Sequence, residues 1–165
     1  MNILFLSRLY YPHVGGVERH LRGLSRALSR RHNITIVTEK HDESLPDVER
    51  MPEALVYRIS LKNVSEKSKK WVIWKWINTN QHLFDQADVI HAEDVYYWII
   101  PYKILHPFKK SFVTFQGWEC RYPIPHRFKL IRRIYELMAD GNVCIGEFIS
   151  KWYGTKPTIV SYAAV

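Results

Sequence analysis

The chain has 165 residues, of which 47% are hydrophobic, and this is the size and composition of one folded domain rather than of a disordered segment. Its formal net charge is +8, and its six tryptophans and ten tyrosines make it rich in aromatic side chains. A basic and aromatic surface suits nucleic acid, anionic lipid or a phosphorylated ligand, and charge alone does not choose among them.

Two further features bear on the compartment and on membranes. Cys120 and Cys144 have neither metal-ligand spacing nor the density of a disulfide framework, which favours a reduced, cytoplasmic setting. The apolar run at the N-terminus ends at Ser7-Arg8 and is therefore a buried strand rather than a signal peptide. No other apolar run approaches the ~20 residues that a bilayer-spanning helix needs.

The first forty residues have the pattern of a βαβ unit. Strands at 2–7 and 33–38 flank a short loop with the pair Gly15-Gly16 and an amphipathic helix over 16–31. A helix N-terminus presents unpaired N–H groups and a positive dipole end, and glycine there lets a phosphate or a sugar approach the backbone. The pair is also compatible with an ordinary turn, because neither a dinucleotide fingerprint nor a P-loop is present.

The predicted helix over 16–31 has two different faces. At about 100° per residue, apolar and basic residues lie on opposite sides: Val17, Leu21, Leu24 and Leu28 against Arg19, Arg22, Arg26 and Arg30. The apolar side is expected to pack on the sheet. The arginine side is either a solvated face or a contact for acidic lipid head groups or another polyanion, and in the second case Arg19 and Arg22 add to a membrane contact.

The rest of the chain alternates between the two periodicities. Further strands are predicted at 54–60, 88–92, 111–115, 141–145 and 157–161, and further helices near 66–86, 94–106, 124–139 and 146–153. The stretch 39–53 holds charges and two prolines and is predicted to be a loop. This alternation predicts an α/β fold, a Rossmann-like parallel sheet of about seven strands with helices on both faces.

The segment 65–84 is notable for where its tryptophans fall. Six apolar residues share one broad helical face: Val72, Ile73, Trp76, Ile77, Leu83 and Phe84. Trp71 and Trp74 lie outside that face, beside Lys70 and Lys75. Tryptophan next to lysine off the core face is typical of an interfacial membrane contact, and the alternative is that both indoles pack under a neighbouring loop.

Polar residues lie at the ends of predicted strands, which meet at the same edge of a parallel sheet as Gly15-Gly16. His91 lies near the end of the strand 88–92, and Gln116 to Glu119 follow the strand 111–115. His91 is either a hydrogen-bonded structural histidine or part of a binding site. Glu119 either binds sugar hydroxyls or is a surface acid.

The N-terminal pattern resembles the opening of family-4 glycosyltransferases of the GT-B fold: a strand from residue 2, Tyr11-Pro12, Gly15-Gly16, Glu18 and a helix ending in Leu28. The resemblance covers essentially all 165 residues. It implies that the chain is the N-terminal, acceptor-side half of a GT-B fold in a retaining enzyme. A nucleotide-sugar donor is then expected to bind mainly on a C-terminal domain absent from this chain, which is either a truncated piece or one half of a split enzyme.

The resemblance also assigns roles to the strand ends. The residues expected to bind substrate are Gly15, Gly16, His91, Gly117, Trp118 and Glu119. Family members commonly carry a histidine near the transferred sugar where this chain has Gln116, and glutamine does not transfer a proton near neutral pH. Gln116 is therefore expected to position the substrate while the leaving phosphate accepts the acceptor's proton. No metal or other cofactor is expected, because the chain has no Asp-x-Asp motif and the family works without one.

The expected partners are a nucleotide-sugar, a glycan or lipid-linked acceptor, an anionic membrane surface and the missing C-terminal domain in cis or in trans. The expected location is the cytoplasm, with peripheral contact at the inner face of the membrane. Two alternatives stay open: a non-enzymatic α/β module that binds a nucleotide or a phosphorylated ligand, and a basic nucleic-acid-binding domain. Nucleic acid is not expected, because the arginine stripe matches no recognised motif.

Overall fold

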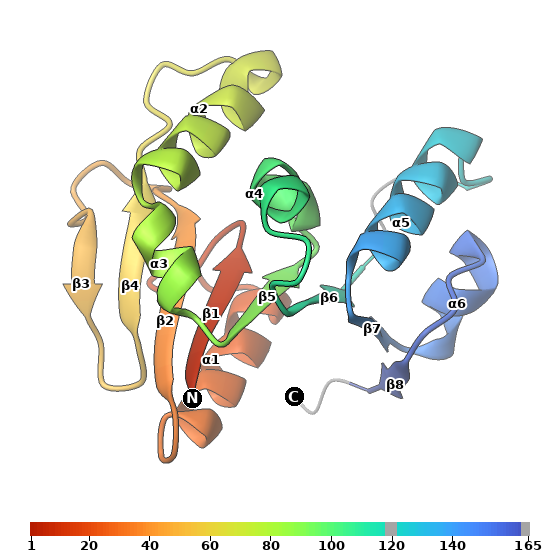
Figure 1. Ribbon diagram of the computed structural model, residues 1–165, viewed down its shortest axis with the longest axis horizontal. Helices are drawn as coiled ribbons and strands as arrows, with labels where there is room; N and C mark the ends of the chain where they lie inside the picture. Colours follow the sequence, from red (N-terminus) through yellow and green to blue (C-terminus); the bar gives the residue numbers. More distant parts are fainter. Residues whose placement is uncertain (118–121, 163–165) are drawn as a thin grey trace.

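The computed structural model describes residues 1–117 and 122–162, in which the strands form one 8-stranded sheet of order β3-β4-β2-β1-β5-β6-β7-β8. Figure 1 shows this order as a row across the molecule. The strands are β1 (Asn2–Ser7), β2 (Asn33–Glu39), β3 (Val48–Arg50), β4 (Leu55–Ile59), β5 (Val89–Glu93), β6 (Ser111–Phe115), β7 (Gly141–Ile145) and β8 (Ile159–Ser161). Every pairing in the described sheet is parallel except that of β3 with β4. The predicted α/β class is confirmed.

The helices connect the strands and cover the sheet. They are α1 (Gly16–Leu28), α2 (Glu66–Thr79), α3 (Gln81–Gln86), the 3₁₀ turn η1 (Tyr96–Ile99), α4 (Ile100–Leu105), α5 (His126–Met138) and α6 (Glu147–Tyr153). Side chains alternate along each strand, so one strand supplies both faces of the sheet. In β1, Leu4 and Leu6 enter the larger core with α2 to α4 and α6, whereas Phe5 enters the smaller core under Leu21 of α1. Helices therefore cover both faces, as predicted.

Three details differ from the sequence prediction. The predicted loop 39–53 contains β3, an antiparallel edge strand whose short, charged and exposed sequence hides its period of two. The predicted helix 66–86 is two helices that meet at Asn80, whose side-chain Nδ2 donates to Trp76 O. The predicted helix 94–106 begins as a 3₁₀ turn, and α4 follows with Pro101 in its first turn, where a missing N–H is tolerated.

The parallel register brings four strand ends to one edge of the sheet. Ser7 pairs with Thr38 of β2 on one side and with Glu93 of β5 on the other. Glu93 in turn pairs with Thr114 of β6. Residues that are far apart in the sequence are therefore neighbours at the carboxyl edge, where ligands bind in parallel α/β sheets.

Candidate functional site

A cleft with a volume of about 740 Å³ opens at this carboxyl edge. Its walls come from the loop after β1, the first turns of α1 and α2, the ends of β2, β5 and β6, and helix α5. The lining residues are Ser7, Arg8, Leu9, Val17, Glu18, Glu39, Glu66, Lys69, Lys70, Glu93, Asp94, Val95, Tyr97, Phe115, Phe128, Ile131, Arg132 and Tyr135. The lining thus combines aromatic rings with charges of both signs, which suits a hydroxylated ligand that has both polar and apolar faces.

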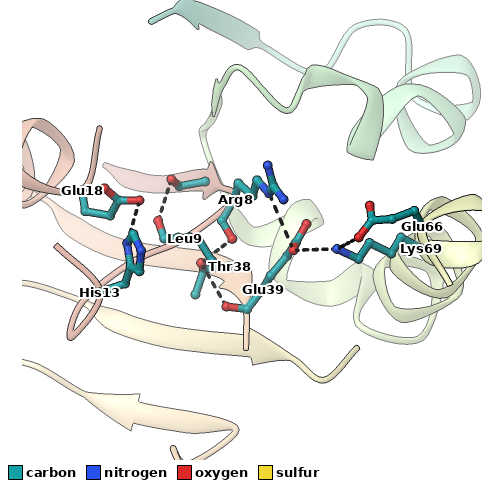
Figure 2. A network of polar contacts seen from close by, with 9 residues as sticks. Arg8, Leu9, His13, Glu18, Thr38, Glu39, Glu66 and Lys69 are labelled. Atoms are coloured by element: carbon teal, nitrogen blue, oxygen red, sulfur yellow. Dashed lines mark hydrogen bonds and ion pairs between the residues drawn. The ribbon is translucent and has the colours of Figure 1, made fainter. Parts of the chain in front are cut away.

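One wall of the cleft is a chain of alternating charges (Figure 2). The Glu39 carboxylate lies 4.0 Å from Arg8 Nε and 3.8 Å from Lys69 Nζ, and Lys69 Nζ lies 2.6 Å from Glu66. Burial raises the pKa of Glu39, and the two cations oppose that rise. These contacts join the start of α2 to the ends of β1 and β2, and they largely neutralise one another.

The glycine turn lies next to the cleft. Helix α1 begins at Gly16 with Gly15 as its N-cap, and the following residues, Val17 and Glu18, line the cleft. The buried Glu18 carboxylate lies against Gly15 and 3.4 Å from His13 Nδ1, so a Cβ at position 15 would collide with it. A Cβ at Gly16 would meet no atom within 4 Å. Space beside the helix start therefore exists at Gly16, whereas at Gly15 the Glu18 side chain would have to move to make room.

His91 lies inside β5 and does not line the cleft. Its Nε2 is 2.6 Å from Thr114 Oγ1, and its ring packs against Phe5 and Phe112 with centroid separations of 5.5 and 6.4 Å. Burial lowers its pKa to about 4, so the imidazole is neutral at physiological pH. These contacts are those of a hydrogen-bonded structural histidine, which was one of the two possibilities for His91.

Gln116 is held by two consecutive acids at the end of β5. Its side-chain Nε2 donates to Glu93 Oε2 at 2.5 Å, and its backbone N–H donates to Asp94 Oδ1 at 2.9 Å. The Glu93 side chain is 0% exposed, and burial raises its pKa to about 8. Asp94 has a φ of 59°, which is an unusual backbone conformation for a non-glycine residue and is often found at functional sites.

The loop after β6 is described only in part. Gly117 O accepts a hydrogen bond of 2.9 Å from Nη2 of Arg132, a buried α5 residue that the sequence did not single out. The Arg132 guanidinium also lies over the rings of Tyr153 and Phe115, at 3.6 and 4.5 Å from their centroids. The predicted site residues Trp118 and Glu119 lie outside the described residues.

The predicted membrane residues of α2 have different environments. Trp71 is 61% exposed, whereas Trp74 is half-buried and its Nε1 donates to Tyr97 O at 2.9 Å. Lys70 Nζ lies over both indoles, at 5.1 and 6.0 Å from their centroids, and Lys75 is exposed. Trp71 is therefore the indole that is exposed enough to contact a membrane. Trp74 instead packs against η1, so the alternative of a packed indole describes Trp74 and not Trp71.

The basic residues of α1 are separated from this group by the sheet, because α1 and α2 cover opposite faces. Arg19 is exposed. Arg22 stacks over the Tyr11 ring at 3.8 Å, and its Nε lies 2.8 Å from the buried Glu53 carboxylate.

In the described part of the chain, no helix combines the length and apolarity needed to cross a bilayer. Nor do three His, Cys, Asp or Glu side chains gather there closely enough to hold a metal ion.

In α/β domains with a Rossmann-like sheet, ligands bind at the carboxyl edge of the sheet. The polar and aromatic cleft of this chain lies at that edge. The sequence profile described as Glycosyltransferase Family 4 matches residues 14–156. The chain belongs to this family, which confirms the resemblance seen in its first forty residues.

Solved structures share the fold at low sequence identity. A sucrose-phosphate synthase from Thermosynechococcus elongatus is 13% identical, with a TM-score of 0.69 over 96% of this chain. A glycosyltransferase from Rickettsia africae (17%, TM-score 0.58, 97% of this chain) and a UDP-N-acetylglucosamine 2-epimerase from Rickettsia bellii (11%, 0.62, 97%) are also similar. The chain spans 47%, 41% and 43% of these proteins, respectively. No curated protein matches this sequence significantly.

Proposed function

We propose that this chain is the N-terminal, acceptor-side domain of a retaining glycosyltransferase. The enzyme moves a sugar from a nucleotide-sugar donor to a saccharide or lipid-linked acceptor. Membership of the family supports the reaction class. The observation that carries the proposal for this domain is the cleft of about 740 Å³ at the carboxyl edge of the sheet, which is large enough for a sugar.

The chemistry of the cleft suits a saccharide. Sugar rings have apolar C–H faces and a rim of hydroxyl groups, so they bind where aromatic rings and hydrogen-bonding groups converge. Phe115, Phe128 and Tyr97 supply aromatic surface in the cleft. Glu93 lines the cleft and supplies a hydrogen-bonding group there, and Gln116 is hydrogen-bonded to Glu93. In this proposal the acceptor lies between these two sets of residues.

The donor is proposed to bind mainly on a second domain, with its phosphates or sugar reaching toward Gly15 and Gly16. The positive end of the α1 dipole favours an anion there. The Glu18 carboxylate lies against Gly15, so its side chain would have to turn away when a phosphate approaches. We propose that the leaving phosphate accepts the acceptor's proton, because glutamine at position 116 does not transfer one. We also propose that no metal ion is required.

Sugar transfer by the protein that carries this domain tests the proposal. UDP- and GDP-sugars are offered with saccharide and polyprenyl-phosphate acceptors, with and without EDTA, and the anomeric configuration of the product is read by NMR. Retention of configuration and activity in EDTA are expected. Transfer with inversion, or a strict requirement for a divalent metal, would contradict the proposal.

Binding measurements on residues 1–165 separate the alternatives. Tight nucleotide binding by this chain without sugar transfer by the whole protein supports a non-enzymatic nucleotide-binding module. Salt-dependent binding to any DNA, without binding to saccharides or nucleotide-sugars, supports a nucleic-acid-binding domain.

A further inference from the structure

Gln116 is held at two points, once through its backbone and once through its side chain. Its backbone N–H is held by Asp94 and its side-chain Nε2 by Glu93. Glu93 is the last residue of the neighbouring strand β5 and Asp94 follows it, and the β5–β6 register brings both acids beside Gln116. The side chain of Gln116 is therefore restrained before any ligand binds, and restrained polar groups lose less entropy on binding.

Among the described residues, only one end of the Gln116 amide has a hydrogen-bond partner. Nε2 donates to Glu93, whereas Oε1 accepts no hydrogen bond among the described residues. The Gln116 side chain is half-buried and lies beside Glu93 and Phe115, which line the cleft. The carbonyl oxygen of the amide thus remains available to accept a hydrogen bond from a hydroxyl group.

Glu93 is suited to hold an amide without adding charge to the cleft floor. It is buried, and its Oε1 lies 3.5 Å from Nε2 of His91, which is itself held at Thr114. Burial raises the pKa of Glu93 to about 8 and lowers that of His91 to about 4, so both groups are mainly neutral at pH 7. A neutral carboxyl group can accept from an amide N–H and donate its own proton.

We propose that Glu93 is a positioning residue, which orients the Gln116 amide so that its carbonyl oxygen accepts a hydrogen bond from a hydroxyl group of the bound saccharide. The nature of this ligand rests on the proposed function, whereas the coupling of Glu93 to Gln116 does not. Position 116 therefore acts through an oriented hydrogen bond, and Glu93 supplies the orientation that glutamine alone lacks.

The coupling is tested in residues 1–165 by solvent exchange of the Gln116 side-chain N–H signals in NMR, with Gln116→Met to assign them. Exchange should become about tenfold faster in Glu93→Leu, which removes the acceptor, and Glu93→Gln should restore protection through its amide oxygen. Glu39→Gln changes another buried acid of the same cleft and should leave these signals unchanged. Equal exchange rates in the parent and Glu93→Leu would overturn the proposal.

A pH titration decides the question if Glu93→Leu does not fold. The charged or titratable groups next to Glu93 are His91 in β5 and Asp94, which follows β5. His20 of α1 acts on His91, and Arg8, Glu18 and Arg132 line the same cleft as Glu93. The Gln116 signals should follow one transition near pH 8 in the parent and in Glu39→Gln, but not in Glu93→Gln. Signals that are insensitive to pH in the parent, or that titrate equally in Glu93→Gln, would overturn the proposal.

The ligand is tested with UDP-N-acetylglucosamine, N-acetylglucosamine and UDP as probes. Under the proposal, the two sugar-containing probes shift the Gln116 signals, UDP alone does not, and the shift is lost in Glu93→Leu. If Glu93 protects Gln116 but no sugar-containing probe shifts its signals, the assignment of a saccharide hydroxyl is overturned. If sugar transfer by the whole protein is absent while both NMR results hold, the proposed function fails and the role of Glu93 stands.

Discussion

Burial decides the charge of the two ionisable groups at the end of β5. His91 and Glu93 are neighbours on the same face of the strand, with 3.5 Å between Nε2 and Oε1. Desolvation disfavours the charged form of each group, so the pKa of the histidine falls and that of the acid rises. A polar cluster can therefore lie inside the sheet without an uncompensated charge.

This cluster predicts how stability depends on pH. The pKa of Glu93 rises from 4.5 unfolded to about 8 folded, so folding binds a proton and stability falls as pH rises through this window. The pKa of His91 falls from 6.5 to about 4, which has the opposite effect below pH 6.5. Between pH 6.5 and 8 only the Glu93 effect remains, and it amounts to at most about 2 kcal/mol.

Urea unfolding at several pH values measures this effect. The free energy of unfolding of the parent, relative to that of Glu93→Gln, should decrease between pH 6.5 and 8. Glu43 is exposed and lies outside this cluster, so Glu43→Gln should follow the parent. A constant difference between the parent and Glu93→Gln across this range would show that Glu93 is already ionised in the folded protein at pH 6.5.

Gly16→Val should weaken ligand binding more than it affects folding. A Cβ at this position has no atom of another segment within 4 Å, so a valine side chain occupies the open space beside the helix start. We expect the melting temperature to change little and the affinity for UDP-N-acetylglucosamine to fall by about tenfold, or about 1.4 kcal/mol. Gly23→Val, at an equally open position on α1, is the matched control. Equal affinity in Gly16→Val and the control would make the pair a plain turn.

Sequence patterns identify only those site residues that interrupt or begin a local pattern. Gln116 stands out because it interrupts a recognisable strand-end pattern, and Gly15 because it directly precedes a predicted helix. Glu93 and Arg132 gain their significance only from burial and from partners on other elements. Such pairing depends on the register of parallel strands and on helix docking, which local periodicity does not encode.

At the scale of elements, strong periodicity predicted the buried strands and the long helices. The run at residues 2–7 coincides with β1, and the helix expected near 124–139 is α5, at His126–Met138. The misses are short or interrupted elements. β3 has three residues on an exposed edge, and the break at Asn80 depends on a side-chain hydrogen bond to Trp76 O.

From the exposed aromatic and basic residues of α2, we predict that the chain binds reversibly to anionic membranes. Trp71 is exposed, Lys70 lies beside it, and Lys67 and Lys75 are also exposed. Each basic residue near an anionic surface contributes about 1 kcal/mol, and an inserted indole adds a contribution that salt does not screen. The chain should therefore co-sediment with vesicles containing phosphatidylserine, more weakly with neutral vesicles, and less as salt increases.

The two tryptophans should contribute differently to this binding. Trp71→Ala should reduce vesicle binding without loss of stability. Trp74→Ala should also cost about 1 kcal/mol of folding free energy, because its hydrogen bond to Tyr97 O is lost. Phe108→Ala removes another exposed aromatic side chain, 95% accessible and outside α2, and should bind vesicles like the parent. Absence of vesicle binding at low salt, or unfolding of the double tryptophan variant, would contradict a membrane role for α2.

The described part of the chain is one sheet with a hydrophobic core on each face. Fully buried residues such as Leu6, Val113 and Trp98 fill the larger core, and Leu21 and Ile36 fill the smaller one. The alternation of strands and helices was enough to predict this architecture, because short, mostly apolar strands that alternate with helices form a parallel sheet covered on both faces. Both cores are formed within this chain, which is the condition for a domain that folds independently.

We therefore predict that residues 1–165 fold alone but do not transfer sugar. The chain spans less than half of each of the three solved proteins named above, and the proposed donor contacts lie mainly on a second domain. Cooperative thermal unfolding followed by circular dichroism tests the folding. Release of UDP or GDP from a panel of nucleotide-sugars, with saccharide and polyprenyl-phosphate acceptors, tests the activity.

The matched control for this last prediction is the same assay on a longer protein in which a donor-binding domain follows these residues, with and without Gly16→Val. The longer protein should release nucleotide in the presence of acceptor, and Gly16→Val should reduce that release. Clear turnover by residues 1–165 alone would mean that this domain holds both substrates. In that case the division of acceptor and donor between two domains would not apply to this protein.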